Sequence, residues 1–260
     1  MHFWKFHGTG NDFVMIDNRA GGFDDNYRHI RKLCDRHFGI GADGLISIGT
    51  SLHHNFSMKY YNADGKEGTM CGNGGRCSVA FAHMLEIFDG LEVSFSAIDG
   101  SHRAKLLEKQ GNQWKVALQM NDVENAGLTF NNTGSPHHIE FVSNLQDTDV
   151  VSLGKAIRNS SEYKDIGGTN VNFLEERNGI LNIRTFERGV EDETLSCGTG
   201  SVAAALALAL KNKLNTGPVE IKTLGGRLQI DFNRTHQKFT DVWLRGPAMK
   251  VFEGFIENQH

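Results

Sequence analysis

The stretch SCGTGSVAAALALAL (196–210) places a glycine-flanked cysteine directly before the longest uncharged apolar run of the chain. An earlier stretch, MCGNGGRCSVAFAHM (70–84), has the same arrangement. Because a helix that is apolar nearly all round must be surrounded by protein, each stretch predicts a helix buried at the centre of a domain. Each helix then begins beside a cysteine, Cys71 in the first and Cys197 in the second.

The two cysteines lie 126 positions apart (197 − 71), and other segments of the chain align at nearly the same offset. The aligned pairs are VSFSAIDGSHRA (93–104) with VEIKTLGGRLQI (219–230), KVALQM (115–120) with DVWLRG (241–246), MKYYNADG (58–65) with IRTFERG (183–189), and GADGLISI (41–48) with TNVNFLE (169–175). Such collinear matches indicate an internal duplication rather than a coincidence.

Each half of this duplication predicts the same order of elements: strand, polar turn, helix, strand, polar elbow, cysteine turn, buried helix and a hairpin of two strands. The fold class is therefore α/β in the broad sense (α+β). We expect two duplicated domains, each with its strands wrapped around a central buried helix. The first should cover residues 1–121 with a C-terminal strand at 248–260, and the second should cover residues 122–247.

An amphipathic helix is predicted at 25–37, where Ile30, Leu33, Cys34 and Phe38 recur at helical spacing. These side chains form one apolar stripe that should pack into the core of the first domain. Within the stripe, Cys34 is expected to act as a small buried hydrophobe.

The four cysteines have neither the spacing of a metal site nor that of a disulfide framework. None stands in a C-x-x-C pair and no H-x-x-x-H motif accompanies them, so no metal is predicted. They are also too few and too scattered for a disulfide scaffold in a chain of 260 residues. Reduced thiols are expected, with Cys77 packed in the core.

Charge and hydropathy favour a small molecule as the partner. The formal net charge is −4 and no helix concentrates Lys and Arg on one face, which argues against nucleic acid. The N-terminus MHFWKFHGTGNDF (1–13) lacks the pattern of a secretory signal, and the longest apolar run is about half of the ~20 residues that cross a bilayer. We expect a cytoplasmic protein that binds neither nucleic acid nor membrane.

The cysteine turns have the features of an anion site. Their glycines leave backbone N–H groups open at a helix start, where the helix dipole also favours an anion and a thiolate. One turn alone is equally well explained as a capped helix start. Two turns that face each other across a cleft between the domains would hold one small anion with a sulfur on each side. Such a pair can take a proton from one face of a carbon and return one to the other, which inverts its configuration.

The polar elbows YNADG (61–65) and FERG (186–189) stand at equivalent positions before the two cysteines. Arg188 in the second elbow is suited to hold a carboxylate through two parallel hydrogen bonds. NADG is also a common turn, and Glu187 with Arg188 also fits a surface ion pair. The equivalence of the two elbows favours a role in binding.

Six motifs together resemble the diaminopimelate epimerase family across nearly the whole chain: HGTGNDF (7–13), NADGKEGTMCGNGGRC (62–77), GSPH (134–137), TNVNF (169–173), ERGVEDETLSCGTG (187–200) and GGRL (225–228). The resemblance implies an isomerase that interconverts LL- and meso-diaminopimelate without a cofactor, on the path to lysine and peptidoglycan. It implies two pseudo-symmetric domains, each a curled and mostly antiparallel sheet around a central helix. We also expect a homodimer.

The resemblance assigns roles to the matching positions of this sequence. Cys71 and Cys197 match the two acid/base cysteines, and His137 and Glu187 match positions that modulate their pKa. The matching substrate contacts are Asn11, Asn62, Asn170, Glu187 and Arg188, and the matching helix-start groups are Gly72, Asn73, Gly198 and Thr199.

Two positions depart from the pattern of the family. Ser135 stands where many members have Asn, and Gly44 stands where some have Gln. Ser135 retains one hydrogen-bond donor, so its contact with a substrate is put in doubt rather than removed.

Three other functions stay open. Proline and hydroxyproline racemases share the CGxG turns but usually carry His where this chain has Asn73, and they lack the ERG elbow. A redox sensor would join Cys71 and Cys197 in a disulfide, which gives Asn11 and Arg188 no role. A binding module without catalysis would need one helix-start pocket rather than two thiols.

Overall fold

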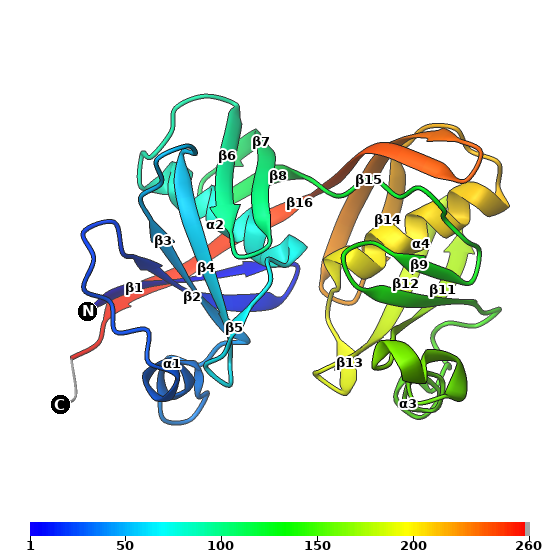
Figure 1. Cartoon of the computed structure of the whole chain (residues 1–260), viewed down its shortest axis with the longest axis horizontal. Helices are drawn as coiled ribbons and strands as arrows, with labels where there is room; N and C mark the ends of the chain where they lie inside the picture. Colours follow the sequence, from blue (N-terminus) through cyan, green and yellow to red (C-terminus); the bar gives the residue numbers. More distant parts are fainter. Residues whose placement is uncertain (258–260) are drawn as a thin grey trace. The chain divides into compact units, whose positions relative to one another are not determined.

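The computed structural model describes residues 1–257 of the chain, which divide into two units (Figure 1). Unit 1 contains Met1–Leu118 and the chain from Gly246 onward, and unit 2 contains Gln119–Arg245. Residues 258–260, the end of the strand expected at 248–260, lie outside the described part. Unit 1 is therefore built from both ends of the chain, whereas unit 2 is one continuous segment.

Unit 1 is a closed barrel of mostly antiparallel strands. The order is β1-β2-β3-β4-β6-β7-β8, and the C-terminal part of β16 pairs with both β8 and β1, which closes the sheet. The pairs β2–β3 and β4–β6 are parallel. The strands are β1 (His2–Gly8), β2 (Asn11–Asp17), β3 (Gly44–Gly49), β4 (Phe56–Asn62), β5 (Glu67–Gly68, beside β4), β6 (Glu92–Ala97), β7 (Gly100–Gln110), β8 (Gln113–Gln119) and β16 (Lys238–Phe255).

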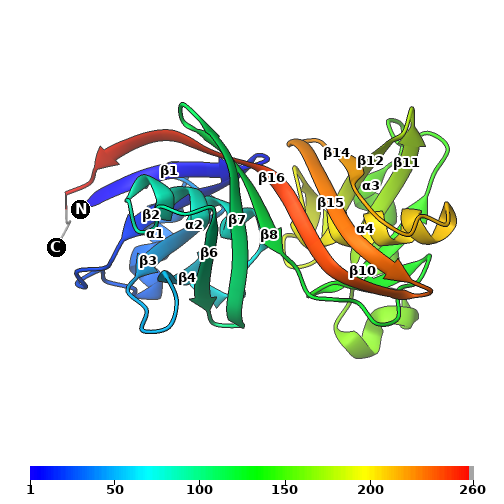
Figure 2. The ribbon, with the colours of Figure 1, turned by 90° about the horizontal axis from the view of Figure 1, so that it is seen from above.

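Helix α2 (Gly72–Met84) runs inside this barrel, where it contacts β1, β2, β3, β4 and β7 (Figure 2). Its residues from Gly72 to Ala82 are all buried. Phe81 packs against Trp4 and Phe6 of β1, with ring centroids 5.0 Å and 5.7 Å away. The predicted central helix of the first half is thereby confirmed, and Cys77 is fully buried on it.

Unit 2 repeats the same topology. Its strands follow the order β9-β10-β11-β12-β14-β15-β16, and the pairs β10–β11 and β12–β14 are parallel. The strands that belong to it are β9 (Phe130–Asn132), β10 (Pro136–Phe141), β11 (Asn170–Arg177), β12 (Ile180–Glu187), β13 (Asp192–Thr194, beside β12), β14 (Val219–Thr223), β15 (Gly226–Thr235) and the N-terminal part of β16.

Helix α4 (Gly198–Lys211) is the central helix of unit 2. Its alanines and leucines belong to one core cluster with side chains of the surrounding strands, among them Ile139, Leu181 and Leu228. Its five alanines leave little side-chain volume between the helix and these strands. The helices α2 and α4 begin 126 residues apart (198 − 72), so the duplication read from the sequence is confirmed.

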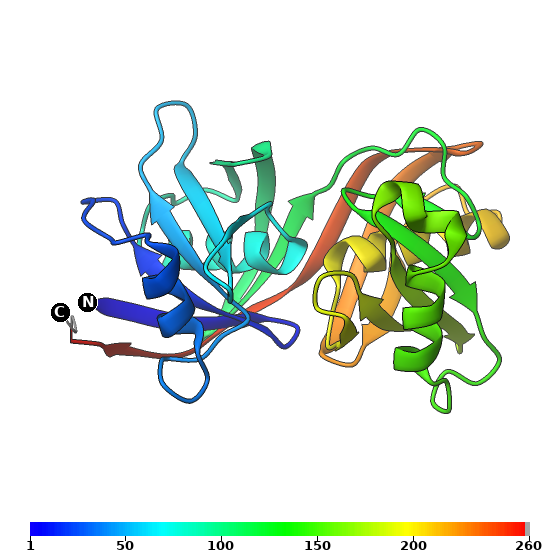
Figure 3. The same ribbon diagram turned by 60° about the horizontal axis from the view of Figure 1, so that its bottom comes forward.

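The remaining helices cover the outer faces of the sheets (Figure 3). Helix α1 (Tyr27–Cys34) contacts β3 in unit 1, and helix α3 (Val150–Arg158) contacts β11 and β12 in unit 2. A short 3₁₀ helix, η1 (Ser161–Ile166), follows α3. Between residues 1 and 257, no helix is long and apolar enough to cross a membrane.

One prediction about α1 is wrong, because the helix ends at Cys34 and Phe38 is 85% exposed. The backbone becomes extended at Asp35, and the N–H of Ile40 donates a hydrogen bond to the carbonyl of Leu33. Ile40 then packs on the core cluster in place of the expected Phe38. A Cβ on Gly39 would lie 2.0 Å from the carbonyl oxygen of Lys32, so this close turn requires glycine.

Candidate active site

Cys71 is the N-cap residue of α2 in unit 1. Its backbone is extended (φ −104°, ψ 151°), and its Sγ accepts a hydrogen bond from the N–H of Gly74 at 3.2 Å. A Cβ on Gly74 would lie only 3.2 Å from this sulfur and from Ile46 Cδ1, which explains the glycine. Cys71 is half-buried, and a sulfur that faces the N–H groups of a helix start is favoured as a thiolate.

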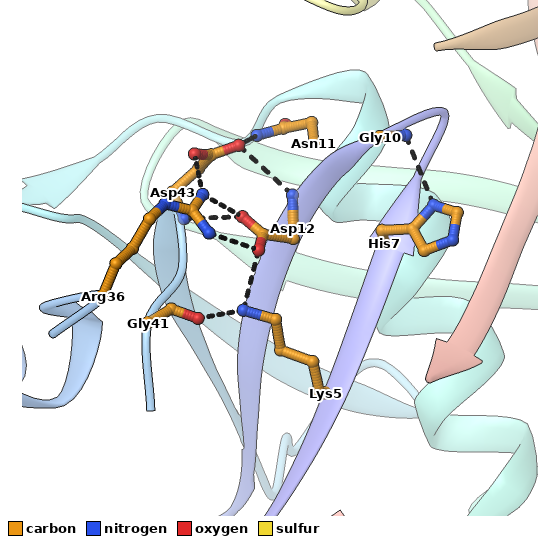
Figure 4. Close-up of polar contacts among 8 residues, drawn as sticks. All are labelled: Lys5, His7, Gly10, Asn11, Asp12, Arg36, Gly41 and Asp43. Atoms are coloured by element: carbon orange, nitrogen blue, oxygen red, sulfur yellow. Dashed lines mark hydrogen bonds and ion pairs between the residues drawn. The ribbon is translucent and has the colours of Figure 1, made fainter. Parts of the chain in front are cut away.

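The next side chain of this turn links Cys71 to strand β2. Asn73 is buried, and its Nδ2 donates to Asn11 Oδ1 at 3.3 Å. Asn11 Nδ2 in turn donates to the carboxylate of Asp43 at 2.8 Å (Figure 4). The structure thus brings three predicted contacts, Asn11, Gly72 and Asn73, to the same end of unit 1 as Cys71.

A network of charged side chains holds the end of β2 in place (Figure 4). Lys5 Nζ lies 2.8 Å from Asp12 Oδ2 and also donates to the carbonyl of Gly41. Arg36 bridges the two acids, with Nη2 2.9 Å from Asp12 Oδ1 and 2.8 Å from Asp43 Oδ1. Burial alone would raise the pKa of Asp12, but the hydrogen bonds from Arg36 and Lys5 outweigh it and lower the pKa to about 2. The carboxylate therefore stays charged near neutral pH.

Asn62 and Gly44 share a neighbour that the sequence did not reveal, Tyr60. Asn62 is exposed at the end of β4, and its Oδ1 accepts a hydrogen bond from the Tyr60 hydroxyl at 2.9 Å. A Cβ on Gly44 would lie 2.6 Å from the ring of Tyr60 and from the carbonyl oxygen of Tyr61. The Tyr60 ring therefore occupies the space into which a glutamine at position 44 would project.

Cys197 is the N-cap residue of α4 and has a different set of neighbours in unit 2. Its Sγ lies 3.6 Å from the hydroxyl of Thr199. That hydroxyl is 2.9 Å from His137 Nε2 and 3.3 Å from Ser135 Oγ. The predicted residues Cys197, Thr199 and His137 are thus brought into one chain of polar contacts.

The imidazole of His137 is fully buried and neutral. Burial, with a smaller contribution from the charge of Arg188, lowers its pKa to about 3. Asn172 Nδ2 donates both to the carbonyl of His138 and to His137 Nδ1, which leaves the ring proton on Nε2. The Nε2–H of His137 therefore donates toward the hydroxyls of Ser135 and Thr199.

Hydrogen bonds of side chains and backbone connect the remaining predicted contacts of unit 2. Asn170 Oδ1 accepts a hydrogen bond from the N–H of Arg188 at 3.0 Å, and Asn170 Nδ2 donates to Ser135 Oγ at 3.3 Å. Glu187 Oε2 accepts a hydrogen bond from Thr194 Oγ1 at 2.8 Å, just before the cysteine turn. Arg188 Nη1 donates to the carbonyl of Gly168 at 3.1 Å. These residues form one cluster, although the sequence motifs that contain them are widely separated along the chain.

Two residues of unit 2 that contact this cluster were missed in the sequence. Asn172 orients His137, and a Cβ on Gly200 would lie 2.5 Å from Asn172 Oδ1. Thr185 donates to the same Oδ1 at 3.0 Å. A signal for Asn172 was present, because it stands two positions after Asn170 on a strand and side chains two apart share a face.

The described residues of the two units offer no set of metal ligands. Among residues 1–257, no group of three or more His, Cys, Asp or Glu side chains is arranged to hold a metal ion. The four cysteines carry reduced thiols. Burial raises the pKa of the Cys34 thiol to about 12 and raises that of Cys77 as well, so these two remain neutral.

The comparison with known families matches both units. A family model described as "Diaminopimelate epimerase" matches residues 3–124 and 129–251. A protein of Flavobacterium psychrophilum named diaminopimelate epimerase is 48% identical over 98% of this chain and 100% of its own length. One of Chlorobaculum tepidum with the same name is 45% identical over 96% of this chain and 98% of its own length.

Solved structures with little sequence identity share the fold. A PhzF-family phenazine biosynthesis protein of Bacillus anthracis superposes with a TM-score of 0.76 at 12% identity, over 99% of both chains. A probable proline racemase of Agrobacterium radiobacter superposes with a TM-score of 0.71 at 13% identity, over 99% of this chain and 93% of its own. At this identity the likeness extends to the fold alone.

Proposed function

Because the chain belongs to the diaminopimelate epimerase family, we propose that it is an isomerase that interconverts LL- and meso-diaminopimelate without a cofactor. The observation that carries this proposal is the repeated placement of a half-buried thiol at the start of a buried helix, Cys71 on α2 and Cys197 on α4. The reaction supplies precursors of lysine and peptidoglycan, in the cytoplasm.

The two cysteines act as the base and the acid on opposite faces of one α-carbon. The thiolate of one cysteine takes the α-proton, so that an S–H bond forms while the C–H bond breaks and its electron pair stays on the substrate. The thiol of the other cysteine then gives its proton to the opposite face and becomes the thiolate. The reverse reaction uses the same groups with their roles exchanged.

The developing negative charge spreads into the α-carboxylate of the substrate, which must be stabilised where it forms. The backbone N–H groups of Gly72 and Asn73, and those of Gly198 and Thr199, begin the two helices and are suited to hold this carboxylate. A preorganised set of N–H donors substitutes for the electron sink that a cofactor would provide.

The polar side chains of both units recognise the rest of the substrate. Arg188 and Glu187 offer opposite charges for the carboxylate and the ammonium group of an amino acid. Their amide partners in this role are Asn11, Asn62 and Asn170. Support comes from the hydrogen bonds that fix Asn11 through Asp43 and Asn170 through Arg188.

His137 and Glu187 tune the second thiol in different ways. A neutral His137 donates its Nε2–H to the Thr199 hydroxyl, which leaves the hydroxyl proton free to point to Cys197 Sγ. Such a contact favours the thiolate of Cys197 without adding a charge. The carboxyl group of Glu187, which accepts a hydrogen bond from Thr194, lies close to the same turn.

We also propose that two copies of the chain form a homodimer. The apolar side chains of Val251, Phe252 and Phe255 on β16 are 52%, 46% and 81% exposed, which supports a second copy as their cover. Light scattering of the purified protein tests this, and a monomer at micromolar concentration would contradict it.

The central experiment incubates the purified protein with LL-diaminopimelate in D₂O without added cofactor. We expect one α-deuterium in each molecule of meso product, since the returned proton comes from a thiol that exchanges with solvent. L-Proline and trans-4-hydroxy-L-proline serve as control substrates. Racemisation of either control with no turnover of diaminopimelate would overturn the proposal in favour of a proline-type racemase.

A further inference from the structure

Arg76 is a fully buried arginine at the start of α2. Its guanidinium donates to the carbonyl oxygens of Gly72 at 3.0 Å and Pro247 at 3.2 Å. It also donates to Asn73 Oδ1 at 3.0 Å and Thr9 Oγ1 at 3.3 Å. All four acceptors are uncharged, so hydrogen bonds satisfy the guanidinium, but among the residues that the structure describes no carboxylate neutralises it.

A buried cation without an anion is unfavourable. Burial lowers the pKa of Arg76 to about 10, which still leaves it protonated at neutral pH. Within residues 1–257, the side chains that would act on its charge when ionised are those of two cysteines, Cys77 and Cys71. Cys77 is fully buried and burial raises its pKa, so it stays neutral. Cys71, half-buried with its Sγ on the Gly74 N–H, is the group that can supply the anion.

We propose that Arg76 is a positioning residue for the epimerisation, whose buried charge stabilises the Cys71 thiolate and whose guanidinium orients the Asn73 and Asn11 amides. The inference rests on the proposed function for its role in turnover. Its electrostatic part concerns the thiol of Cys71 alone and holds whether or not diaminopimelate is the substrate.

The orientation of the amides follows from a directed chain of hydrogen bonds. Arg76 Nη2 can only donate, so it selects the oxygen of Asn73, and Asn73 Nδ2 then donates to Asn11 Oδ1. At the other end the Asp43 carboxylate can only accept, so it selects Asn11 Nδ2 (Figure 4). A cation at one end and an anion at the other fix both amides in one direction.

The other charged groups around α2 do not replace Arg76. On β1 and β2, Lys5 and Asp12 form an ion pair with each other, and burial lowers the pKa of His7, which favours its neutral form. Strand β3 has no titratable side chain. The buried side chains of β4 and β7 are the apolar Phe56, Met58, Ala104 and Leu106, together with Tyr61, whose hydroxyl donates to Asp25. Among the described residues packed around α2, Arg76 is therefore the buried cation that no carboxylate pairs with, and it lies beside the Cys71 turn.

The experiment measures how fast iodoacetamide alkylates each cysteine between pH 5 and 10, in the full chain without substrate. Peptide mass spectrometry separates Cys71 from Cys197, and the buried Cys34 and Cys77 do not compete. The variants are Arg76→Met, which removes the charge at similar length, and Arg76→Lys, which keeps it. Arg103→Met, which removes an exposed arginine from β7 of the same unit, is the matched control.

In Arg76→Met, we expect the midpoint of the Cys71 profile to rise by about one pH unit, as for a thiolate that loses a neighbouring cation. Arg76→Lys should keep most of the wild-type midpoint. It should still lower kcat, because an ammonium group lacks the planar fork that spans several acceptors. The Cys197 midpoint should not change in any variant, nor should either midpoint in Arg103→Met.

Two outcomes with the Arg76→Met variant overturn the inference. One is an unchanged Cys71 midpoint in folded Arg76→Met, and the other is an equal shift of Cys71 and Cys197, which would indicate general loosening. The wild type gives a measurement that needs no variant, since a Cys71 midpoint at or above the ordinary value of ~8.5 also overturns it. Because alkylation requires no turnover, failure to epimerise diaminopimelate leaves this result readable.

Discussion

The two cysteine turns occupy equivalent positions of a duplicated fold, but the buried side chains next to them differ in charge. The first has the buried cation Arg76, while its equivalent in the second turn (76 + 126 = 202) is the buried and apolar Val202. The second turn has instead the neutral imidazole of His137, which reaches Cys197 through Thr199. The same backbone therefore favours a thiolate by a charge in one unit and by a hydrogen-bond chain in the other.

This difference suits a reaction that must begin with one sulfur as a thiolate and the other as a thiol. Two identical environments would give two thiols with equal pKa, and neither would be favoured as the base. One turn tuned by a fixed charge and one tuned by hydrogen bonds can be adjusted separately, because a substitution in one unit leaves the other unit's neighbours in place. The predictions below test this independence, beginning with the largest effect.

Replacing either cysteine by alanine should lower epimerisation by about 10³-fold or more, since a two-base reaction needs both groups. The two variants should differ in which isomer still exchanges its α-proton with solvent. Cys71→Ala should still exchange the α-proton of one isomer with solvent without inversion, and Cys197→Ala should exchange that of the other isomer. Proton NMR in D₂O with each pure isomer measures this, and wild-type epimerisation by either variant would contradict the mechanism.

His137→Phe should lower kcat by about 10- to 100-fold, because it removes the donor that orients Thr199 toward Cys197. The pKa of His137 is about 3, so the imidazole does not titrate between pH 5 and 9. The shape of the kcat/KM profile over that range should therefore match that of the wild type. Loss of a step near pH 6.5 in the variant would show that His137 carries a proton after all.

Gly200→Ala and Gly74→Ala compare the packing of the two helix starts. A Cβ at position 200 would lie 2.5 Å from Asn172 Oδ1, whereas at position 74 its nearest neighbours are 3.2 Å away. We expect Gly200→Ala to lower the free energy of unfolding by about 1–3 kcal/mol. Gly74→Ala should change it little, because the better helix propensity of alanine offsets the tighter contact. Urea unfolding measures both, and equal losses would contradict the comparison.

Asp12→Asn should weaken unit 1 by about 2 kcal/mol at pH 7, because the pKa of Asp12 falls from its ordinary 3.8 to about 2 on folding. A carboxyl group whose pKa is depressed by folding stabilises the protein above its unfolded pKa. That contribution is lost as the pH falls from about 4 to 2. Urea unfolding of both proteins at pH 7 and pH 3 should show a difference that shrinks at the lower pH, and a constant difference would exclude this origin.

The architecture was predictable because it depends on patterns that repeat along the chain. The apolar runs after Cys71 and Cys197 and their common offset gave the two central helices and the duplicated order of strands. The end of α1 was not predictable from spacing, since Phe38 has the right period. What excludes it from the core is the turn at 35–41, which returns Ile40 to the carbonyl of Leu33.

The side chains that surround the two cysteine turns were harder to predict from the sequence. Arg76 stands in a glycine-rich segment, where an arginine is usually solvated, and its burial depends on acceptors at Thr9 and Pro247, which are far away in the chain. The packing of Tyr60 over Gly44 is likewise a contact between strands. The two asparagines of TNVN, by contrast, share one face of β11, a relation that the spacing alone contains.

The last strand also determines the order in which the protein can fold during synthesis. Unit 2 is continuous in sequence, but unit 1 lacks the strand between β8 and β1 until the ribosome has made the end of β16. The edges of β1 and β8 therefore stay unpaired until this strand has been made, which happens after the last residue of unit 2. A chain truncated near residue 245 would leave the edges of β1 and β8 without their partner strand, although it would contain all of unit 2.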